Sequence, residues 1–293
     1  MTDKGRFDIA VLITCYNRKQ KTLQFLQSLV NQSAFDKEKI DIYLLNDGST
    51  DGTPEAVASK YPFVKILNSP GNLFWAGGMR VIWEYAIAQK HYDLFLLVND
   101  DIELFENSLE RLLISYGNLN KKGVVLVGST LSPTTKKWSY GGYKLYNKKY
   151  SNHYHIEPDD NKVLDCHLAN GNILLVDAAT VNKIGVFLDS FTHFTADFDY
   201  TYTAHKAGID LLVAPGYYAY CEDDHGARWL SGKHSLKERI KFLYSHKGLT
   251  YKEYLLYIKK HFPSDYFSSA AKLWLKTLFP IIWDKFKKRD GRK

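Results

Sequence analysis

The sequence predicts an α/β protein with a mostly parallel central sheet flanked by helices, followed by a basic helical C-terminal extension. Three observations support this fold class. Compact apolar runs alternate with segments of helical periodicity over the first 130 residues. These runs are rich in branched side chains, which is typical of parallel strands buried on both faces. From residue 235 onward, apolar side chains recur at helical spacing among many lysines.

The order of elements follows from these patterns. Strands are predicted at the apolar runs 8–14, 41–45, 64–67, 92–98, 124–127, 173–176 and 211–214. Helices are predicted at 21–31, 54–61, 76–89, 108–116 and 198–207, where apolar side chains recur every three or four residues. Thr53 is the expected N-cap of the second helix, and Pro54 lies in its first turn. Residues 132–165 are rich in Tyr, Lys, Asn and Gly, and this composition predicts hairpins and loops.

These elements predict the domain organisation. We expect one α/β domain over residues 1–232, with a first half at 1–130 and a second half at 131–232. A helical extension is expected at 233–293. The chain shows no internal repeat and no low-complexity linker.

Length and composition exclude several classes of protein. A chain of 293 residues with 45% hydrophobic and 24% charged residues is neither disordered, collagenous nor a coiled coil. Its three cysteines lie far apart, which disfavours a disulfide framework or a zinc site and fits a reducing compartment. The early apolar run is too short for a signal peptide, and no run is long enough to span a membrane. We therefore expect a soluble, cytoplasmic protein.

The net charge of +7 is unevenly distributed. Residues 233–293 carry 16 Lys and Arg against 5 Asp and Glu, whereas the first 232 residues carry 23 basic and 27 acidic side chains. Such an extension fits contact with an anionic membrane, contact with nucleic acid, or simple solubility. Nucleic acid is the least favoured partner, because the acidic body would oppose binding to phosphates.

Polar segments follow three of the predicted strands, where ligands bind in open α/β sheets. They are TCYNR at 14–18, NDGSTD at 46–51 and NDD at 99–101. Each segment alone also fits a helix-capping turn. The adjacent carboxylates of Asp100 and Asp101 repel each other, and a divalent cation bridging to a diphosphate would relieve that repulsion. Glycine-rich phosphate loops of the dinucleotide-binding and P-loop types are absent from the sequence.

These motifs resemble a known enzyme family. DIAVLITCYNR, IYLLNDGSTDGT and LFLLVNDDIEL together resemble the nucleotide-sugar-binding half of family 2 glycosyltransferases with the GT-A fold. GNLFWAGGMR resembles a segment of the rhamnosyltransferase-like branch, and the resemblance extends to about Arg228. It implies an inverting enzyme that transfers a sugar from a nucleoside diphosphate donor to an acceptor.

The resemblance assigns roles in donor binding. Thr14, Tyr16 and Asn17 match the segment that flanks the base and ribose, and Asp47 matches the acid that accepts the N3–H of a pyrimidine. Gly77, Gly78 and Arg80 match the loop that closes over the diphosphate and sugar, although the two glycines also fit a tight turn before a helix. Arg80 stands where this branch usually has Asn.

The NDD segment matches the metal-binding motif of the family. Asp101 matches the direct ligand of Mg²⁺ or Mn²⁺, Asp100 lies beside it at the donor, and Asn99 replaces the usual first Asp. Farther on, His225 matches a residue that completes the metal site or touches the diphosphate, and Arg228 lies nearby. An isolated histidine also fits an ordinary polar surface.

The acid–base group is expected in the second half. Asp197 matches the catalytic base of the family, which takes the proton of the acceptor hydroxyl. Ala196 replaces the preceding Glu, and Asp199 matches an acid that we expect to be structural. Asn170 and Gly171 match the strand entry near the acceptor. Trp75, Trp138 and Tyr140 fit either stacking on sugars or core packing.

The extension has a separate interpretation. Phe267, Ala271, Trp274, Leu278 and Ile281 recur at helical spacing, and Pro280 is expected to kink or end the helix. Such a stripe fits either peripheral contact of residues 265–293 with the anionic inner face of the cytoplasmic membrane or docking on the body.

The sequence therefore predicts a metal-dependent inverting glycosyltransferase of cell-surface polysaccharide synthesis. The donor is expected to be dTDP-rhamnose or a UDP-sugar, and the acceptor a glycan or a lipid-linked saccharide. A catalytically silent subunit that binds sugar nucleotides or glycans is the alternative from another class, supported by Ala196 and Asn99. A sugar nucleotidyltransferase is a further alternative, although such an enzyme would carry a Gly-rich basic loop where this chain has TCYNR.

Overall fold

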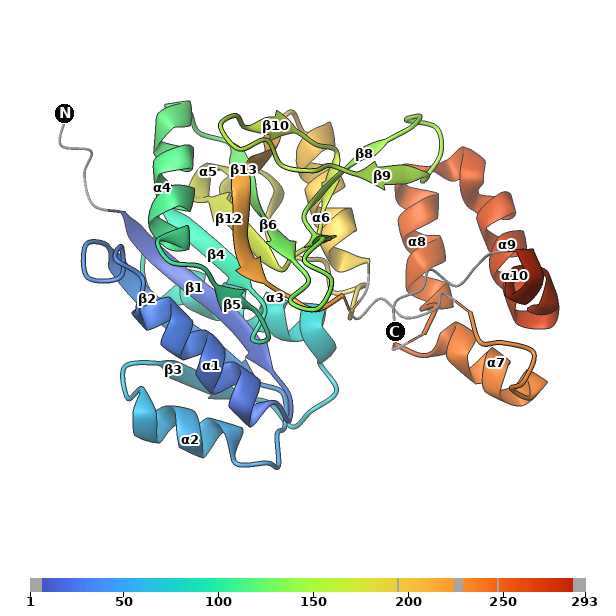
Figure 1. The fold of residues 1–293 in the computed structure, drawn as a ribbon, viewed down its shortest axis with the longest axis horizontal. Helices are drawn as coiled ribbons and strands as arrows, with labels where there is room; N and C mark the ends of the chain where they lie inside the picture. The colour runs from blue at the N-terminus through green and yellow to red at the C-terminus, as the bar shows by residue number, and fades with distance from the viewer. Residues whose placement is uncertain (1–6, 194, 224–228, 247, 287–293) are drawn as a thin grey trace. The chain divides into compact units, whose positions relative to one another are not determined.

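The structure is a computed structural model that describes residues 7–193, 195–223, 229–246 and 248–286. Two compact units make up the chain. The first comprises residues 1–144, 154–192 and 196–223, and the second comprises 145–153, 193–195 and 224–293. Figure 1 shows the course of the chain.

The first unit is built on a mixed sheet in the order β10-β13-β6-β12-β4-β1-β2-β3. Its strands are β1 (Asp8–Cys15), β2 (Lys39–Asn46), β3 (Lys65–Asn68), β4 (Leu94–Val98), β6 (Val124–Leu131), β10 (Leu164–Asp165), β12 (Ile173–Asp177) and β13 (Asp210–Tyr220). The neighbours β1–β2, β2–β3, β1–β4 and β6–β13 pair in parallel, whereas β12 runs antiparallel to both β4 and β6. The predicted mostly parallel α/β sheet is confirmed.

Helices cover both faces of this sheet (Figure 1). The helices of the first unit are α1 (Lys19–Val30), α2 (Thr53–Lys60), α3 (Phe74–Gln89), α4 (Ser108–Leu119), α5 (Ala178–Ile184) and α6 (Ala196–Lys206). Alternate side chains of β1 point to opposite faces, so that Ile9, Val11 and Ile13 pack with α1 and α4 in one apolar cluster. On the other face, Trp83 of α3 packs against Tyr200 of α6, with ring centroids 5.3 Å apart.

Shorter strands lie outside the main order of the sheet. They are β5 (Glu103–Leu104), β7 (Trp138–Tyr140), β8 (Gly142–Leu145), β9 (His153–His155) and β11 (Leu168–Ala169). β5 pairs with β13 and β7 with β6, whereas β11, β8 and β9 form a three-stranded sheet. The prediction of hairpins and loops over residues 132–165 is thereby confirmed.

Most predicted elements differ from the observed ones only at their ends. β13 is longer than expected, because a bulge near Gly216 (φ +73°) carries the strand on to Tyr220. The helix α5 and the strand β5 were not predicted. Thr53 is not the N-cap of α2; Gly52 takes that position, and Asp51 accepts a hydrogen bond from the Thr53 N–H at 3.0 Å.

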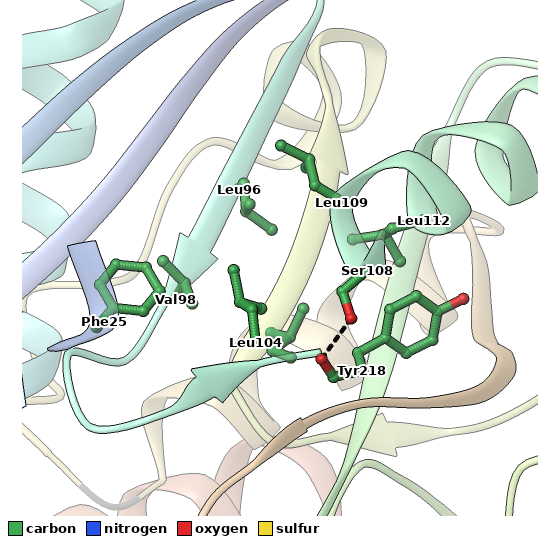
Figure 2. A pocket seen from close by; sticks show the side chains of 9 residues that line it. Phe25, Leu96, Val98, Leu104, Ser108, Leu109, Leu112 and Tyr218 are labelled. Carbon is green, nitrogen blue, oxygen red and sulfur yellow. Dashed lines mark hydrogen bonds between the residues drawn. The ribbon is translucent and has the colours of Figure 1, made fainter. Parts of the chain in front are cut away.

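A small cavity lies in the core of the first unit (Figure 2). It holds about 10 Å³ and is lined by side chains of β4, α4, β13 and neighbouring elements, including Leu96, Leu109 and Tyr218. The Ser108 hydroxyl donates to the Tyr218 carbonyl at 2.5 Å beside it. A cavity of this size holds at most one water molecule, so it is a packing defect and not a ligand site.

The second unit is helical. Its elements are α7 (Leu236–Tyr244), α8 (Tyr251–His261), a 3-10 turn (Pro263–Asp265), α9 (Tyr266–Leu278) and α10 (Ile281–Phe286). α7 begins at a capping box formed by Ser235 and Glu238. Leu243, Leu255 and Leu273 form its apolar core. As predicted, the chain is helical here and the helix before Pro280 ends at Leu278. In the described part of the chain, no helix is both long and apolar enough to cross a membrane.

Candidate functional site

The topology brings the predicted motifs to one edge of the sheet. The carboxyl ends of β1 and β2 are level, since Cys15 pairs with Asn46, and β4 runs parallel beside β1. Because β12 is antiparallel to β4, its first residues lie next to the end of β4, and the Asn99 N–H donates to the Asn172 carbonyl at 3.2 Å. The polar segments that follow different strands therefore share this edge.

The loops after β1 and β2 are tied together by side chains. Asn17 has a left-handed backbone (φ +50°), and its side-chain oxygen accepts a hydrogen bond from the Thr50 N–H at 2.8 Å. Asp51 accepts a hydrogen bond from the Lys19 N–H at the start of α1 at 3.0 Å. Tyr16 is 57% exposed and presents its ring at this edge, whereas Thr14 is buried. The NDGSTD segment thus caps a helix and also builds the edge.

Asp47 anchors the chain before α3. Its carboxylate accepts hydrogen bonds from the Ser69 hydroxyl at 2.6 Å and from the N–H groups of Leu73 at 3.1 Å and Phe74 at 2.9 Å. A carboxylate offers about four acceptor positions, so one remains for a further donor. Contact of Asp47 with a pyrimidine N3–H stays a prediction.

An open hollow lies at the carboxyl ends of β2 and β3, beside α2. Its volume is about 550 Å³, and its lining includes Asn46, Gly48, Ser49, Asn68 and Ser69. Gly48 has a left-handed backbone (φ +78°), and a Cβ there would lie 3.0 Å from the Gly71 backbone. Glycine at this position therefore allows the two loops to meet.

Gly77, Gly78 and Arg80 lie within α3 and not in a loop. A Cβ on Gly78 would lie 2.7 Å from Leu45 Cδ2 and 3.1 Å from Thr14 Cγ2, so this glycine lets α3 approach the sheet. The Nε of Arg80 is buried and has no hydrogen-bond partner. Contact of these residues with a diphosphate stays a prediction.

Arg18 bridges the two adjacent carboxylates after β4. Its guanidinium lies 2.7 Å from Asp101 Oδ2 and 3.3 Å from Asp100 Oδ1. The other oxygen of Asp100 accepts from the Thr22 hydroxyl at 2.9 Å. Burial raises the pKa of Asp100 to about 6, against the opposing effect of Arg18. We did not predict this role for Arg18, although it lies within the TCYNR segment.

Asp101 has the free oxygen that a metal ligand needs. Its Oδ1 is buried and has no hydrogen-bond partner, and hard divalent cations prefer such carboxylate oxygens. No group of three His, Cys, Asp or Glu side chains gathers in a metal-binding arrangement among the described residues. The predicted second ligand, His225, and the neighbouring Arg228 lie outside the described residues. Binding of a cation by Asp101 stays a prediction.

Trp75 links the segment after β4 to the start of β12. Its indole N–H donates to Asn99 Oδ1 at 2.9 Å. A Cβ on Gly171 would lie 2.5 Å from the edge of the same indole and 3.5 Å from Asp197 Cβ. The indole therefore lies against the Gly171 backbone, between Asn99 and the neighbourhood of Asp197. Trp75 also packs on Phe187, so its contacts combine core packing with a position in the site.

Asp197 is a buried carboxylate in the first turn of α6. Its two oxygens accept hydrogen bonds from the Gly171 N–H at 3.1 Å and from the Phe198 N–H at 2.8 Å. Burial raises the pKa of Asp197 to about 7, while these donors and the Asn170 amide oppose the increase. A carboxylate with such a pKa is half-ionised near neutrality and can both take up and release a proton.

Other predicted residues have mainly structural contacts. Tyr140 is buried in the core cluster, and Asp199 is buried in α6. Trp138 packs edge-on against Tyr143, with ring centroids 5.4 Å apart. In contrast, Tyr143 donates a hydrogen bond to Asn170, a contact that we did not predict because residues 132–165 carry no readable motif.

The sequence matches the family described as Glycosyl transferase family 2 over residues 10–171. This match covers more than half of the chain and includes all three strand-end segments. The chain belongs to glycosyltransferase family 2. The family assignment agrees with the resemblance found in the motifs; assignment to the rhamnosyltransferase-like branch goes beyond it.

A related protein of this type occurs in Rickettsia bellii. It is described as an uncharacterized glycosyltransferase and is 24% identical over 203 residues, which cover 65% of this chain. The matched part is only 26% of the relative, so the chain spans about a quarter of the length of that protein.

Solved glycosyltransferase structures share the fold. The mannosyltransferase PcManGT from Pyrobaculum calidifontis, in complex with GDP-Man and Mn²⁺, matches with a TM-score of 0.56 and 13% identity, over 96% of this chain and 72% of that one. TarS 1–349 of S. aureus in complex with UDP matches with a TM-score of 0.57 and 14% identity, over 94% and 77% of the two chains. The fold is therefore that of GT-A glycosyltransferases.

Proposed function

We propose that this glycosyltransferase transfers a sugar, with inversion, from a pyrimidine nucleoside diphosphate to a glycan or lipid-linked saccharide of the cell surface. Asp47 and the neighbouring Tyr16 would bind the base, and Asp197 would act as the base towards the acceptor. The preferred donors are dTDP-rhamnose and UDP-sugars. The preference for rhamnose rests on the likeness of residues 71–80 to the rhamnosyltransferase-like branch.

The observation that carries the proposal is the linkage between Asp197 and the segment after β4. Trp75 donates to Asn99 on one side and lies against Gly171 on the other, and the Gly171 N–H donates to Asp197. A carboxylate suited to proton transfer and the Asn99–Asp101 segment are thus parts of one connected site. This arrangement is what transfer between a bound donor and an acceptor requires.

The chemistry assigned to the chain is a single displacement. Asp197 takes the proton of the acceptor hydroxyl as its oxygen forms a bond to the anomeric carbon. The bond from that carbon to the diphosphate oxygen breaks on the opposite face, and the diphosphate leaves with the electron pair. The configuration at the anomeric carbon is therefore inverted.

The leaving diphosphate carries negative charge that the site has to accommodate. Asp101 would hold Mg²⁺ or Mn²⁺ through its unpartnered oxygen, and such a cation stabilises charge on a diphosphate. Arg80, whose Nε has no partner, is the side chain of α3 that we assign to the phosphates. Both proposed assignments are supported by polar atoms that have no hydrogen-bond partner within the protein.

The test is release of nucleoside diphosphate from a panel of UDP-, dTDP- and GDP-sugars, with saccharide acceptors. We expect turnover of one pyrimidine donor and a loss of about 10²- to 10⁴-fold in Asp197→Asn. Asp189→Asn, which changes an exposed carboxylate, is the matched control and should behave as wild type. Donor binding without turnover across the whole acceptor panel would instead indicate a silent binding subunit.

We further propose that the second unit contacts an anionic membrane surface through the outer face of α9 and through α10. Phe267, Leu275 and Leu278 are exposed along α9, and Ile281 and Ile282 are exposed in α10. Lys272, Lys276 and Lys285 lie in the same two helices. An apolar face beside lysines fits anionic headgroups over an acyl layer.

The structure corrects one part of the predicted stripe. Trp274 does not belong to the outer face, because it packs on the apolar core of the second unit and donates to the Tyr251 hydroxyl at 3.2 Å. The two faces of α9 therefore differ. Its inner face, with Ser269, Leu273 and Thr277, is buried, and its outer face is available for a membrane.

A further inference from the structure

Asn170, which precedes the Gly171 that donates to Asp197, is itself bonded by a side chain from a distant part of the sequence. Tyr143 lies on β8, which pairs with β11 so that Tyr143 is opposite Leu168. Asn170 follows β11 directly, and its N–H donates to the Gly141 carbonyl at 3.0 Å. The Tyr143 hydroxyl donates to Asn170 Oδ1 at 2.8 Å. The paired strands thus place a phenol on the amide next to Asp197.

This hydrogen bond determines which way the Asn170 amide faces. An amide has one acceptor oxygen and one donor NH₂ group, and the oxygen is taken by Tyr143. The NH₂ group is then the end that faces Asp197, whose Oδ2 accepts a hydrogen bond from the N–H of the next residue, Gly171, at 3.1 Å. The Asn170 side chain lowers the pKa of the carboxyl against the effect of burial. Without the phenol, the amide can rotate so that its oxygen faces Asp197. The amide oxygen and the carboxylate then repel each other.

We propose that Tyr143 is a positioning residue: it orients the Asn170 amide so that the amide NH₂ holds the ionised Asp197 carboxylate in place for the acceptor. This inference rests on the proposed function in that Asp197 is taken as the base. The three-residue chain of contacts from Tyr143 through Asn170 to Asp197 does not depend on that function.

The ring of Tyr143 also has a packing role that a test has to preserve. It lies edge-on to Trp138 at 5.4 Å and to Phe198 at 5.2 Å between ring centroids. Tyr143→Phe keeps the ring and removes only the hydroxyl. The variant therefore isolates the hydrogen bond to Asn170.

Other titratable groups near α6 have to be considered. Besides tyrosines, those on α6 and on the segments packed against it are Asp199, His205, Lys206, Lys183 of α5, Asp210 of β13, Arg80 and Glu84 of α3, and His167, whose ring lies 4.8 Å from that of His205. The leading contributions to the pKa of Asp197 are burial, the Gly171 and Phe198 N–H groups and the Asn170 amide. A change in the pKa of Asp197 that is caused by a substitution at Tyr143 is therefore transmitted through the Asn170 amide.

The experiment measures the titration of the Asp197 carboxyl directly, by carbon-13 NMR of protein labelled at aspartate. Asp197→Asn identifies the resonance. In Tyr143→Phe we expect the pKa of Asp197 to rise by about half to one unit, the size of one hydrogen bond to the ionised form. The acid limb of kcat/KM should move by the same amount, which lowers activity about three- to tenfold on its acid side.

A double-mutant cycle gives the specific control. In an Asn170→Ala background the link from Tyr143 through Asn170 to Asp197 is already broken. Adding Tyr143→Phe should therefore not shift the pKa of the Asp197 carboxyl any further. Tyr150→Phe, at an exposed tyrosine, should leave both readouts unchanged. An unshifted Asp197 resonance in Tyr143→Phe, or an equal shift in both backgrounds, would overturn the inference. A shifted Asp197 resonance with an unchanged acid limb of kcat/KM would support the link from Tyr143 to Asp197 and contradict the role of Asp197 as the base.

Discussion

Asp197 differs from Asp101 in the groups that surround its carboxylate. It is buried, and its ionised form is supported by backbone N–H groups and one amide instead of a cation. Asp101 is the opposite case, with a guanidinium at one oxygen and nothing at the other. These different surroundings support the roles that we propose for them, proton transfer for Asp197 and cation binding for Asp101.

The buried carboxyl of Asp197 has a measurable cost in stability. Its pKa is raised from 3.8 to about 7, so folding loses stability as the pH rises from about 4 through 7. Replacing it with the uncharged Asn removes this loss. The free energy of unfolding of Asp197→Asn, relative to wild type, should therefore increase over this range by roughly 1.4 kcal/mol for each unit of the shift. Denaturant titrations across this pH range measure it, and a difference independent of pH would refute the expectation.

Metal binding is expected to depend on Asp101. Calorimetric titration with Mn²⁺ alone should show an affinity at least about tenfold lower in Asp101→Asn than in wild type. Asp160→Asn, which alters an exposed carboxylate elsewhere in the first unit, is the control. Equal affinities in all three proteins would place the cation elsewhere.

Gly171 is constrained by the indole that joins the two parts of the site. Gly171→Ala would bring a methyl group to 2.5 Å from the Trp75 ring, so the ring has to move away from Asn99. We expect a loss of stability of about 1–3 kcal/mol together with a loss of turnover. Measurement of both, and of the indole N–H resonance of Trp75, would test this; an unmoved resonance would speak against the linkage.

At the scale of elements, α3 shows how neighbouring glycines differ. A Cβ on Gly77 would meet only Leu73 Cβ at 3.6 Å, an ordinary contact, whereas one on Gly78 would meet Leu45 at 2.7 Å. Gly77→Ala should stabilise the helix by about 0.5–1 kcal/mol. Gly78→Ala should destabilise the protein by about 1–3 kcal/mol through overpacking. Thermal unfolding of the pair tests this, and equal effects would show that α3 does not approach the sheet as described.

The strands of the sheet show which features of the fold could be predicted from the sequence. Buried parallel strands such as β1 and β4 are compact apolar runs, so their positions were recognisable. The direction of β12 in the sheet could not be predicted, because an apolar run does not indicate whether its strand is parallel or antiparallel to its neighbours. It is this antiparallel strand that brings Asn172 to Asn99. The Tyr143–Asn170 contact depends on pairing between β8 and β11, which no local pattern encodes.

At the scale of the whole molecule, the basic charge is concentrated in residues 233–293. The exposed apolar side chains of α9 and α10, with Phe267 the most exposed at 85%, lie in the same region. From the sequence, only the attraction of this positive charge for anions could be predicted. Which face of α9 is free to meet them follows only from the packing of Leu273 and Trp274.

Binding to lipid vesicles tests this surface. The protein should sediment with vesicles rich in phosphatidylglycerol and not with phosphatidylcholine vesicles, and salt should weaken binding. Phe267→Ser combined with Leu275→Ser should reduce binding by more than about tenfold, as about 0.8 kcal/mol is lost for each CH₂ no longer buried. Ile114→Ser, at an exposed apolar residue of α4, is the control. Unaltered binding of the double variant would exclude this face.

The pH dependence of kcat/KM, measured with the donor that the panel identifies, tests the role of Asp197 most directly. Because the base has to be ionised, activity should fall tenfold per pH unit below a pKa of about 7. The residual activity of Asp197→Asn should lack this limb, while Asp189→Asn should retain it. An acid limb of kcat/KM with a midpoint near the ordinary pKa of an aspartate would contradict the assignment of Asp197 as the catalytic base. So would an acid limb that persists in Asp197→Asn.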